Sequence, residues 1–147
     1  MSNHEEAAIR RQIEKIVEAI SAQDLGSLKQ LYTTDVVSFD VEPPLQHVGI
    51  EAKLANWSHA FSVFESTTYE VRDLTIELSG DVAIGHGFAR ISGTLMNGTL
   101  TDGMWVRITY GCRKVGGTWL IAHDHVSVPL EIASGKGIVD LDPPAAN

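Results

Sequence analysis

Asp124 is one residue whose type and spacing could support chemistry. Residues near the C-terminal end of the chain alternate in type, and one alternating set is apolar apart from this carboxylate: Leu120, Ala122, Asp124, Val126 and Val128. An apolar strip with one carboxylate is typical of a ligand-pocket wall. We therefore expect Asp124 and Val126 to point inward, and His123 and His125 to lie on the other face of the strand.

The strand expected over residues 82–93 supplies a second set of candidates. One face carries Val82, Ile84, His86, Phe88, Arg90 and Ser92, whereas the other carries Ala83, Gly85, Gly87 and Ala89. If the face with large side chains is inward, Phe88 contacts a ligand and His86 can donate or shuttle a proton, while Arg90 can bind a carboxylate or enolate. The alternative is that Arg90 pairs with an acidic neighbour at the rim and His86 is a core histidine.

His123 and His125 also have the spacing of two metal ligands on one strand face. A pair without a third ligand is more often structural, and our face assignment places His86 on the opposite side. No Gly-x-Gly-x-x-Gly motif follows a strand and opens a helix. We therefore predict no metal and no cofactor.

Three helices and a sheet must position these groups. Apolar residues at helical spacing predict a first helix that ends near Ala22 and a short second helix capped by Asp24. A third helix is predicted from a bulky apolar face, of which Trp57 and Phe61 are expected to contact a ligand. The face comprises Ile50, Leu54, Trp57, Phe61 and Phe64.

The remainder of the chain is predicted to form strands. Residues 36–41 predict one strand, Pro43 and Pro44 predict a turn, and a short edge strand is expected over 46–48. From Thr67 onward the period is two, and turn residues at 80–81, 97–98 and 116–117 divide the segment into four long strands. Helices followed by an antiparallel meander indicate an α+β fold.

Composition limits the partners. The chain has 147 residues and a formal net charge of −8, which opposes binding to nucleic acid or to an anionic membrane. Its single cysteine, Cys112, cannot form an intramolecular disulfide, and the start of the chain lacks the apolar core of a signal peptide. We therefore expect a cytoplasmic protein without a membrane span.

The order of elements from about Ile9 to about Pro129 resembles that of the nuclear transport factor 2 superfamily. Within it, the residues at 41–49, 104–107 and 119–129 closely resemble SnoaL-like and ketosteroid isomerase-like proteins. The resemblance implies a conical α+β barrel, in which three N-terminal helices pack inside a strongly curved, mixed but mostly antiparallel sheet. It also implies one domain over residues 1–147, with a core of about 5–130 and a tail at 131–147.

The resemblance places Asp40 at the position of the isomerases' base. A carboxylate at the mouth of an apolar pocket has a less favourable charged form, which makes it a better base toward a carbon-bound proton. The alternative is that Asp40 only caps the following turn. The isomerases' tyrosine falls at Ile16 and their protonated carboxylic acid near Thr109, so both of their oxyanion donors are missing.

The register of these families also favours Trp105 and Arg107 as inward residues, with Asp124 as a possible partner for the arginine. If the register is off by one residue, Arg107 is a solvated surface charge. The resemblance thus implies a pocket for a small hydrophobic carbonyl compound, with Asp40, His86 and Asp124 as catalytic candidates. The alternative is a non-catalytic ligand-binding or assembly domain, and a homodimer formed through the outer sheet face is expected in either case.

Overall fold

The computed structural model describes residues 2–145. Asp24 caps the second of three helices, because its carboxylate accepts a hydrogen bond of 3.0 Å from the backbone N–H of Ser27. The helices are α1 (Ser2–Ser21), α2 (Leu25–Lys29) and α3 (Ile50–Val63). All three form where the apolar spacing predicts them, except that α3 ends at Val63, so Phe64, which was predicted on its apolar face, is instead the first residue of a strand.

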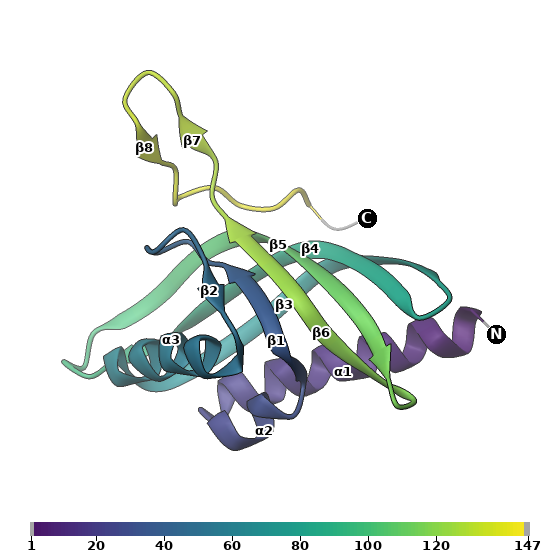
Figure 1. Ribbon diagram of the computed structural model, residues 1–147. Coiled ribbons are helices and arrows are strands. Elements are labelled where there is room, and N and C mark those ends of the chain that lie inside the picture. The colour runs from purple at the N-terminus through teal and green to yellow at the C-terminus, as the bar shows by residue number, and fades with distance from the viewer. Residues whose placement is uncertain (1, 146–147) are drawn as a thin grey trace.

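A six-stranded sheet packs on these helices (Figure 1). Its order is β2-β1-β6-β5-β4-β3, with β1 parallel to β6 and every other neighbouring pair antiparallel. The strands are β1 (Tyr32–Phe39), β2 (His47–Val48), β3 (Phe64–Ser79), β4 (Val82–Leu95), β5 (Leu100–Val115) and β6 (Thr118–Ser127). β1 begins four residues before the predicted strand, because Tyr32 already pairs with Ile121 of β6.

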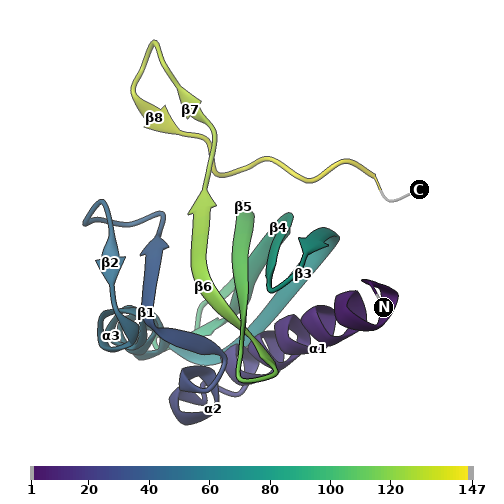
Figure 2. The ribbon, with the colours of Figure 1, turned by 45° about the vertical axis from the view of Figure 1, so that its right-hand side comes forward.

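The long strands bend because residues are inserted into the ladder at bulges. One bulge in β5 contains Gly103, whose φ is +68°, and a Cβ atom there would lie 1.8 Å from the carbonyl oxygen of Ile91. Only glycine permits both this backbone conformation and this approach. The bent sheet curls over α1 and α3, as Figure 2 shows.

The predicted α+β fold with a mixed, mostly antiparallel sheet is confirmed. The cone shape is not confirmed, because the sheet stays open: β2 and β3 form its two edges. The main core lies between α1 and the sheet and includes Ile9, Ile13, Ile20, Ile121 and Trp119, each at most 3% exposed. None of the helices in residues 2–145 is long and apolar enough to span a membrane.

The segment after β6 leaves the body of the protein. It forms a separate hairpin of β7 (Leu130–Glu131) and β8 (Lys136–Gly137), which pair only with each other within the described part of the chain. The hairpin stands clear of the rest of the molecule, and the residues after it turn back over the sheet (Figures 1 and 2). Arg72 of β3 holds this returning segment by donating a hydrogen bond to the carbonyl oxygen of Pro144.

Candidate active site

A row of polar side chains crosses the inner face of the sheet. His47 of β2 is opposite Ser38 of β1, Ser38 is opposite Asp124 of β6, and Asp124 is opposite Tyr110 of β5. Residues directly opposite one another in adjacent strands project from the same face. Asp40 follows Ser38 by two residues and joins the same side, so the sheet register gathers these groups at one place.

Lys53, on α3, adds a positive charge to this polar cluster. Its ammonium lies 2.9 Å from Oδ2 of Asp124 and 3.7 Å from Oδ1 of Asp40, and its side chain is only 3% exposed. The other oxygen of Asp124 accepts a short hydrogen bond from the hydroxyl of Ser38. A buried charge is stable only when it is paired and hydrogen-bonded, and both Lys53 and Asp124 meet that requirement.

Asp40 is held less tightly than Asp124. Its Oδ2 accepts a hydrogen bond of 3.0 Å from the side-chain amide of Asn56, and Nε2 of His47 lies 3.6 Å from the same oxygen. The nearest charge to Oδ1 is Lys53, at 3.7 Å. Of the two carboxylates, Asp40 therefore has the less engaged oxygen, Oδ1, whereas both oxygens of Asp124 have close partners.

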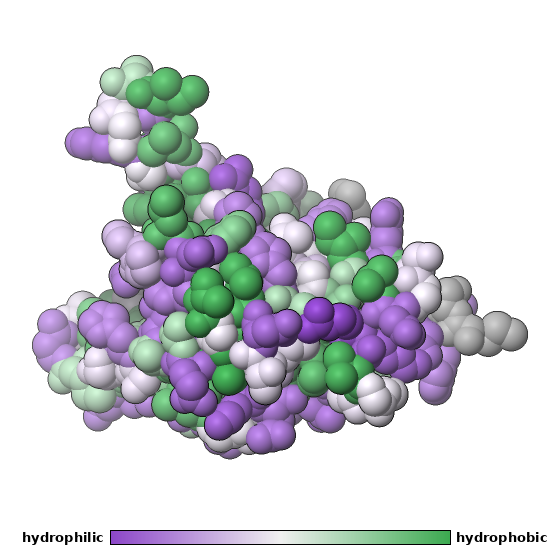
Figure 3. Space-filling model, viewed as in Figure 1, coloured by the Kyte–Doolittle hydropathy of each residue, from purple (hydrophilic) through white to green (hydrophobic). Residues whose placement is uncertain are grey.

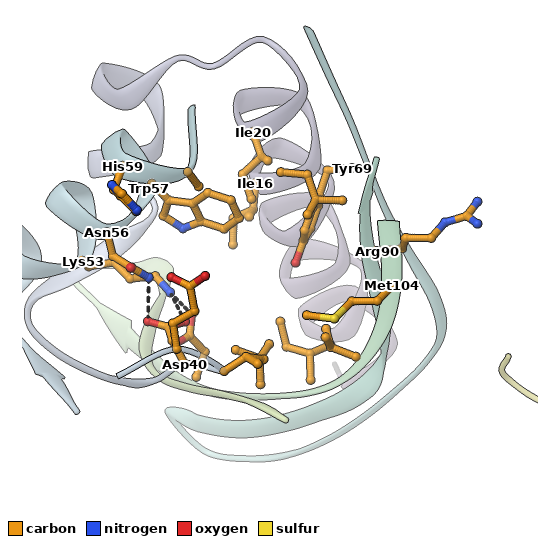
Figure 4. A pocket seen from close by; sticks show the side chains of 18 of the residues that line it. Ile16, Ile20, Asp40, Lys53, Asn56, Trp57, His59, Tyr69, Arg90 and Met104 are labelled. Atoms are coloured by element: carbon orange, nitrogen blue, oxygen red, sulfur yellow. Dashed lines mark hydrogen bonds and ion pairs between the residues drawn. The ribbon is translucent and has the colours of Figure 1, made fainter. Parts of the chain in front are cut away.

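An apolar cavity of about 290 Å³ opens beside this cluster. Figure 4 shows Asp40, Lys53 and Asn56 at one end, with Trp57 on one side and Tyr69 and Met104 across from them. The sheet contributes aliphatic side chains to the opposite wall, and α1 contributes Ile16 and Ile20. The lining from the sheet includes Ile91, Met104, Val106, Ile108 and Val126.

Three tyrosines surround the cavity. Burial raises the pKa of Tyr32, Tyr69 and Tyr110 above the usual tyrosine value, and the negative charge of Asp124 acts in the same direction. These hydroxyls therefore stay protonated and can donate hydrogen bonds. The hydroxyl of Tyr110 and the indole N–H of Trp57 are buried and make no hydrogen bond of ordinary geometry in the described part of the protein, although Tyr69 lies close to Tyr110 and Tyr32 lies close to Trp57.

The structure brings part of the predicted site together. Asp40, Asp124, Trp57 and Val126 all line the cavity, and Lys53 takes the place that the sequence suggested for Arg107 as the partner of Asp124. Phe61 packs beside Trp57, with ring centres 5.6 Å apart, but it lies in the core rather than in the cavity wall.

The predicted face of β4 is wrong. Ala83 and Ala89 point inward and are buried, which places His86, Phe88 and Arg90 on the outer face. Small side chains are needed inside because the β3 backbone comes close: a Cβ atom at Gly87 would lie 2.6 Å from the carbonyl oxygen of Arg72. His86 and Phe88 consequently do not reach the cavity.

Arg90 adopts the alternative role considered from sequence. Its side chain points away from the cavity in Figure 4, although the residue is part of the cavity lining. Its Nε donates a hydrogen bond of 2.9 Å to Oε1 of Glu70. The guanidinium also stacks on the ring of Trp105, 4.8 Å from the ring centre. On the outer face, Arg90 thus pairs with Glu70 and stacks on Trp105.

The predicted face of β5 is wrong by one residue. Met104, Val106, Ile108 and Tyr110 form the inner set, so Trp105 and Arg107 face outward. Arg107 is exposed and donates a hydrogen bond of 3.1 Å to Ser127. The same shift turns Thr109 outward and brings the hydroxyl of Tyr110 inside.

The histidines of β6 lie on the outer face, as predicted, and His86 shares that face. His86, Thr109 and His125 are aligned across β4, β5 and β6, and Nδ1 of His123 is bonded to the carbonyl of Val37. Within residues 2–145, no three metal-ligating side chains gather in one place.

Sequence reasoning missed Lys53, the three tyrosines and Asn56. Lys53 left a signal, because it falls on the apolar face of α3 between Ile50 and Trp57, where a charge has no reason to be unless it has a buried partner. Tyr110 was missed because the sequence analysis assigned the opposite face of β5 to the interior.

Comparison with solved structures identifies the class of fold. An NTF2-like protein of unknown function from Pseudomonas putida shares 30% identity, with a TM-score of 0.87, and the match covers 97% of this chain and 99% of that chain. An NTF2-like superfamily protein from Salmonella enterica serovar Typhimurium has 18% identity and a TM-score of 0.80, over 94% of this chain and 100% of that one. Aln2 from a Streptomyces species has 12% identity and a TM-score of 0.74, over 84% and 90% of the respective chains.

Residues 9–131 match the SnoaL-like domain family, and the chain belongs to that family. No curated protein matches the chain by sequence.

Proposed function

We propose that this chain is a cofactor-free enzyme that moves a proton on a small, largely apolar carbonyl compound held in the cavity. In type, this is the chemistry of an isomerase or cyclase. The observation that carries the proposal is the position of Asp40, a carboxylate at the polar end of an apolar cavity with one oxygen lacking a short contact. Such a carboxylate is suited to act as a general base.

The two carboxylates have different roles in this proposal. Asp124 is engaged by Lys53 and Ser38 through both of its oxygens, so it positions the ammonium rather than reacting. Asp40 takes the proton from a carbon next to the substrate carbonyl. The electrons of the C–H bond form the enolate double bond, negative charge develops on the carbonyl oxygen, and Asp40 then returns the proton to another atom of the same molecule.

Hydrogen-bond donors must face the oxygen on which the charge develops. The donors expected from the isomerase pattern are absent, since Ile16 lines the cavity with aliphatic atoms and Thr109 faces outward. Tyr110, Trp57 and Lys53 border the same cavity and carry O–H and N–H groups. These groups support the proposal because they replace the missing donors.

A second candidate function is ligand binding without catalysis. The apolar wall favours it, because aliphatic side chains such as Ile16, Val106 and Ile108 bind a hydrophobic molecule without any reaction. The two candidates differ only in whether Asp40 accepts a proton from the bound molecule.

The proton-transfer proposal can be tested without knowing the natural substrate. 5-Nitrobenzisoxazole loses one carbon-bound proton to a base, its N–O bond breaks, and the electrons pass to oxygen to give a coloured phenolate. We expect the protein to accelerate this reaction with saturation, and the Asp40→Asn variant to lose about 100-fold or more of the rate, because the amide is not basic.

The matched control is Asp102→Asn, which neutralises an exposed carboxylate on β5. It should retain the rate of the unmodified protein. Saturable binding of the probe with no acceleration, or equal rates for the protein and Asp40→Asn, would leave binding alone as the function.

A further inference from the structure

His47 has a buried nitrogen that the proposed proton transfer does not use. Its side chain is 12% exposed, and its Nε2 makes no hydrogen bond within residues 2–145. A buried polar atom without a partner is uncommon in folded proteins. One acidic atom, Oδ2 of Asp40, lies 3.6 Å from Nε2, which is slightly beyond hydrogen-bonding distance. His47 is therefore held next to the proposed base without being bound to it.

The edge of the sheet holds His47 in this position. β2 pairs with β1 alone in the sheet, and it also contacts α3. Because His47 is opposite Ser38, its side chain projects toward the inner face, where Asp40 follows two residues later. Figure 3 shows many hydrophilic residues on the face of the molecule that carries β2 and α3. Water thus reaches this edge and can exchange protons with a side chain that is not fully enclosed.

Asp40 is the only acidic residue of the described chain with a side-chain oxygen within 4 Å of His47. The elements around His47 carry further ionisable groups, several of which are paired with other residues. They are Asp35 of β1, paired with Arg113; Glu42 of the turn; Glu51 of α3, paired with Lys29; Lys53 and His59 of α3; and Asp124 of β6, paired with Lys53. A change in the charge of His47 therefore acts first on Asp40.

Histidine is the side chain that commonly gains a positive charge between about pH 5 and 8. A positive charge next to a carboxylate stabilises its ionised form and so weakens it as a base. The imidazolium form of His47 can also donate a charge-assisted hydrogen bond to Oδ2 of Asp40. That oxygen already accepts a bond from Asn56, but a carboxylate oxygen has a second lone pair. The neutral ring adds no charge and leaves the base strength of Asp40 unchanged.

We propose that His47 is a positioning residue that sets how strongly Asp40 acts as a base. When His47 is neutral, Oδ1 of Asp40 is available to the bound molecule at full basicity. When His47 is charged, it binds the same carboxylate through Oδ2 and makes it a weaker base. For its effect on rate, this inference rests on the proposed proton transfer by Asp40. The contact between the two residues can be measured without any substrate.

Nuclear magnetic resonance of the imidazole rings tests the contact. Burial and the ammonium of Lys53 disfavour the charged ring of His47, whereas the carboxylate of Asp40 favours it. We expect the titration midpoint of His47 to move to lower pH by about 1 unit or more in Asp40→Asn, because only the unfavourable effects remain. His86, which is exposed on the outer face, should titrate alike in both proteins. An unchanged midpoint for His47 would overturn the proposal, whether or not the protein is a catalyst.

The pH dependence of the probe reaction is the second test. With 5-nitrobenzisoxazole, we expect the rate of the unmodified protein to fall about tenfold more than that of His47→Gln between about pH 8 and about pH 5.5, because the amide gains no charge. His86→Gln removes a histidine that does not reach the cavity, so it should keep the pH dependence of the unmodified protein. Circular dichroism checks that each variant is folded.

The two tests separate this inference from the proposed function. Equal pH dependence for the unmodified protein and His47→Gln would overturn the role of His47 while leaving Asp40 as the base. A protein that accelerates the reaction at no pH, but in which the midpoint of His47 moves in Asp40→Asn, would contradict the proton-transfer proposal and leave only the contact between the two residues.

Discussion

Lys53 lies between two carboxylates that would repel each other in its absence. Its ammonium contacts Asp124 at 2.9 Å and Asp40 at 3.7 Å, and the rings of Tyr32 and Trp57 lie 5.5 and 5.9 Å from it. Removing one partner of a buried ion pair leaves an uncompensated charge, which costs far more than the pair contributes. At the scale of residues, Lys53 is therefore the group on which the integrity of the site depends.

We predict that Lys53→Met lowers the free energy of unfolding by about 3–5 kcal/mol, because both carboxylates remain buried near each other. The double variant Lys53→Met/Asp124→Asn should lose less than the sum of the two single variants. Urea denaturation measures all three. Additive losses would show that the two side chains do not act as a pair. Arg11→Met, which breaks two exposed ion pairs on α1, should leave stability nearly unchanged.

The buried tyrosines predict sensitivity to alkali. Because the pKa of Tyr110 is raised by burial in the folded protein, the unfolded chain loses this proton first as pH rises. The stability contributed by the protonated hydroxyl is fully present below the unfolded-state pKa of about 10 and is lost as pH rises above it.

We therefore expect the free energy of unfolding to fall between about pH 9 and about pH 11, and to fall less steeply in Tyr110→Phe. Urea denaturation at each pH measures the difference in slope. Parallel slopes for the two proteins would mean that the hydroxyl ionises as readily in the folded state as in the unfolded state.

At the scale of elements, the helices and strands could be predicted, but the inward face of each strand could not. Alternation separates the residues of a strand into two sets and does not say which set is inside. In β4 the large side chains lie outside because Gly87 and Ala89 must be close to neighbouring backbone and core. Arg90 and Trp105 were predicted to be pocket residues, although they stack on each other on the outer surface.

The face of β6 was predictable only in part. Trp119 and Ile121 are buried, yet Asp124 is buried as well, so inward residues change from odd to even numbers along one strand. The cause is a bulge: Cys112 pairs with Ile121 and Gly111 pairs with His123, which leaves Ala122 as an inserted residue. The apolar residues near Asp124 were enough to predict that it points inward. The bulge itself could not be predicted, because no simple sequence pattern marks it.

The bulge at Gly103 gives a prediction at this scale. Gly103→Ala should lower the free energy of unfolding by about 1–3 kcal/mol more than Gly98→Ala, although both glycines have positive φ. The reason is the contact with Ile91, since a Cβ atom at Gly98 has nothing within 4 Å. Thermal and urea denaturation compare the two variants. Equal losses would show that backbone conformation alone, and not close approach, requires glycine at position 103.

At the scale of the whole molecule, the open curved sheet and α3 leave a cavity with one polar end. Fold and family follow from the order of elements, but Lys53, Asp40 and Asp124 come from α3, the residue after β1 and β6, and only the folded chain brings them together.

The most direct measurement of the central claim is a crystal structure of Asp40→Asn with 5-nitrobenzisoxazole bound. The account predicts the ring of the probe between Trp57 and the aliphatic wall of the sheet, with its reactive C–H within hydrogen-bonding reach of the side chain at position 40. A probe bound outside the cavity, or oriented with that C–H away from position 40, would contradict the account.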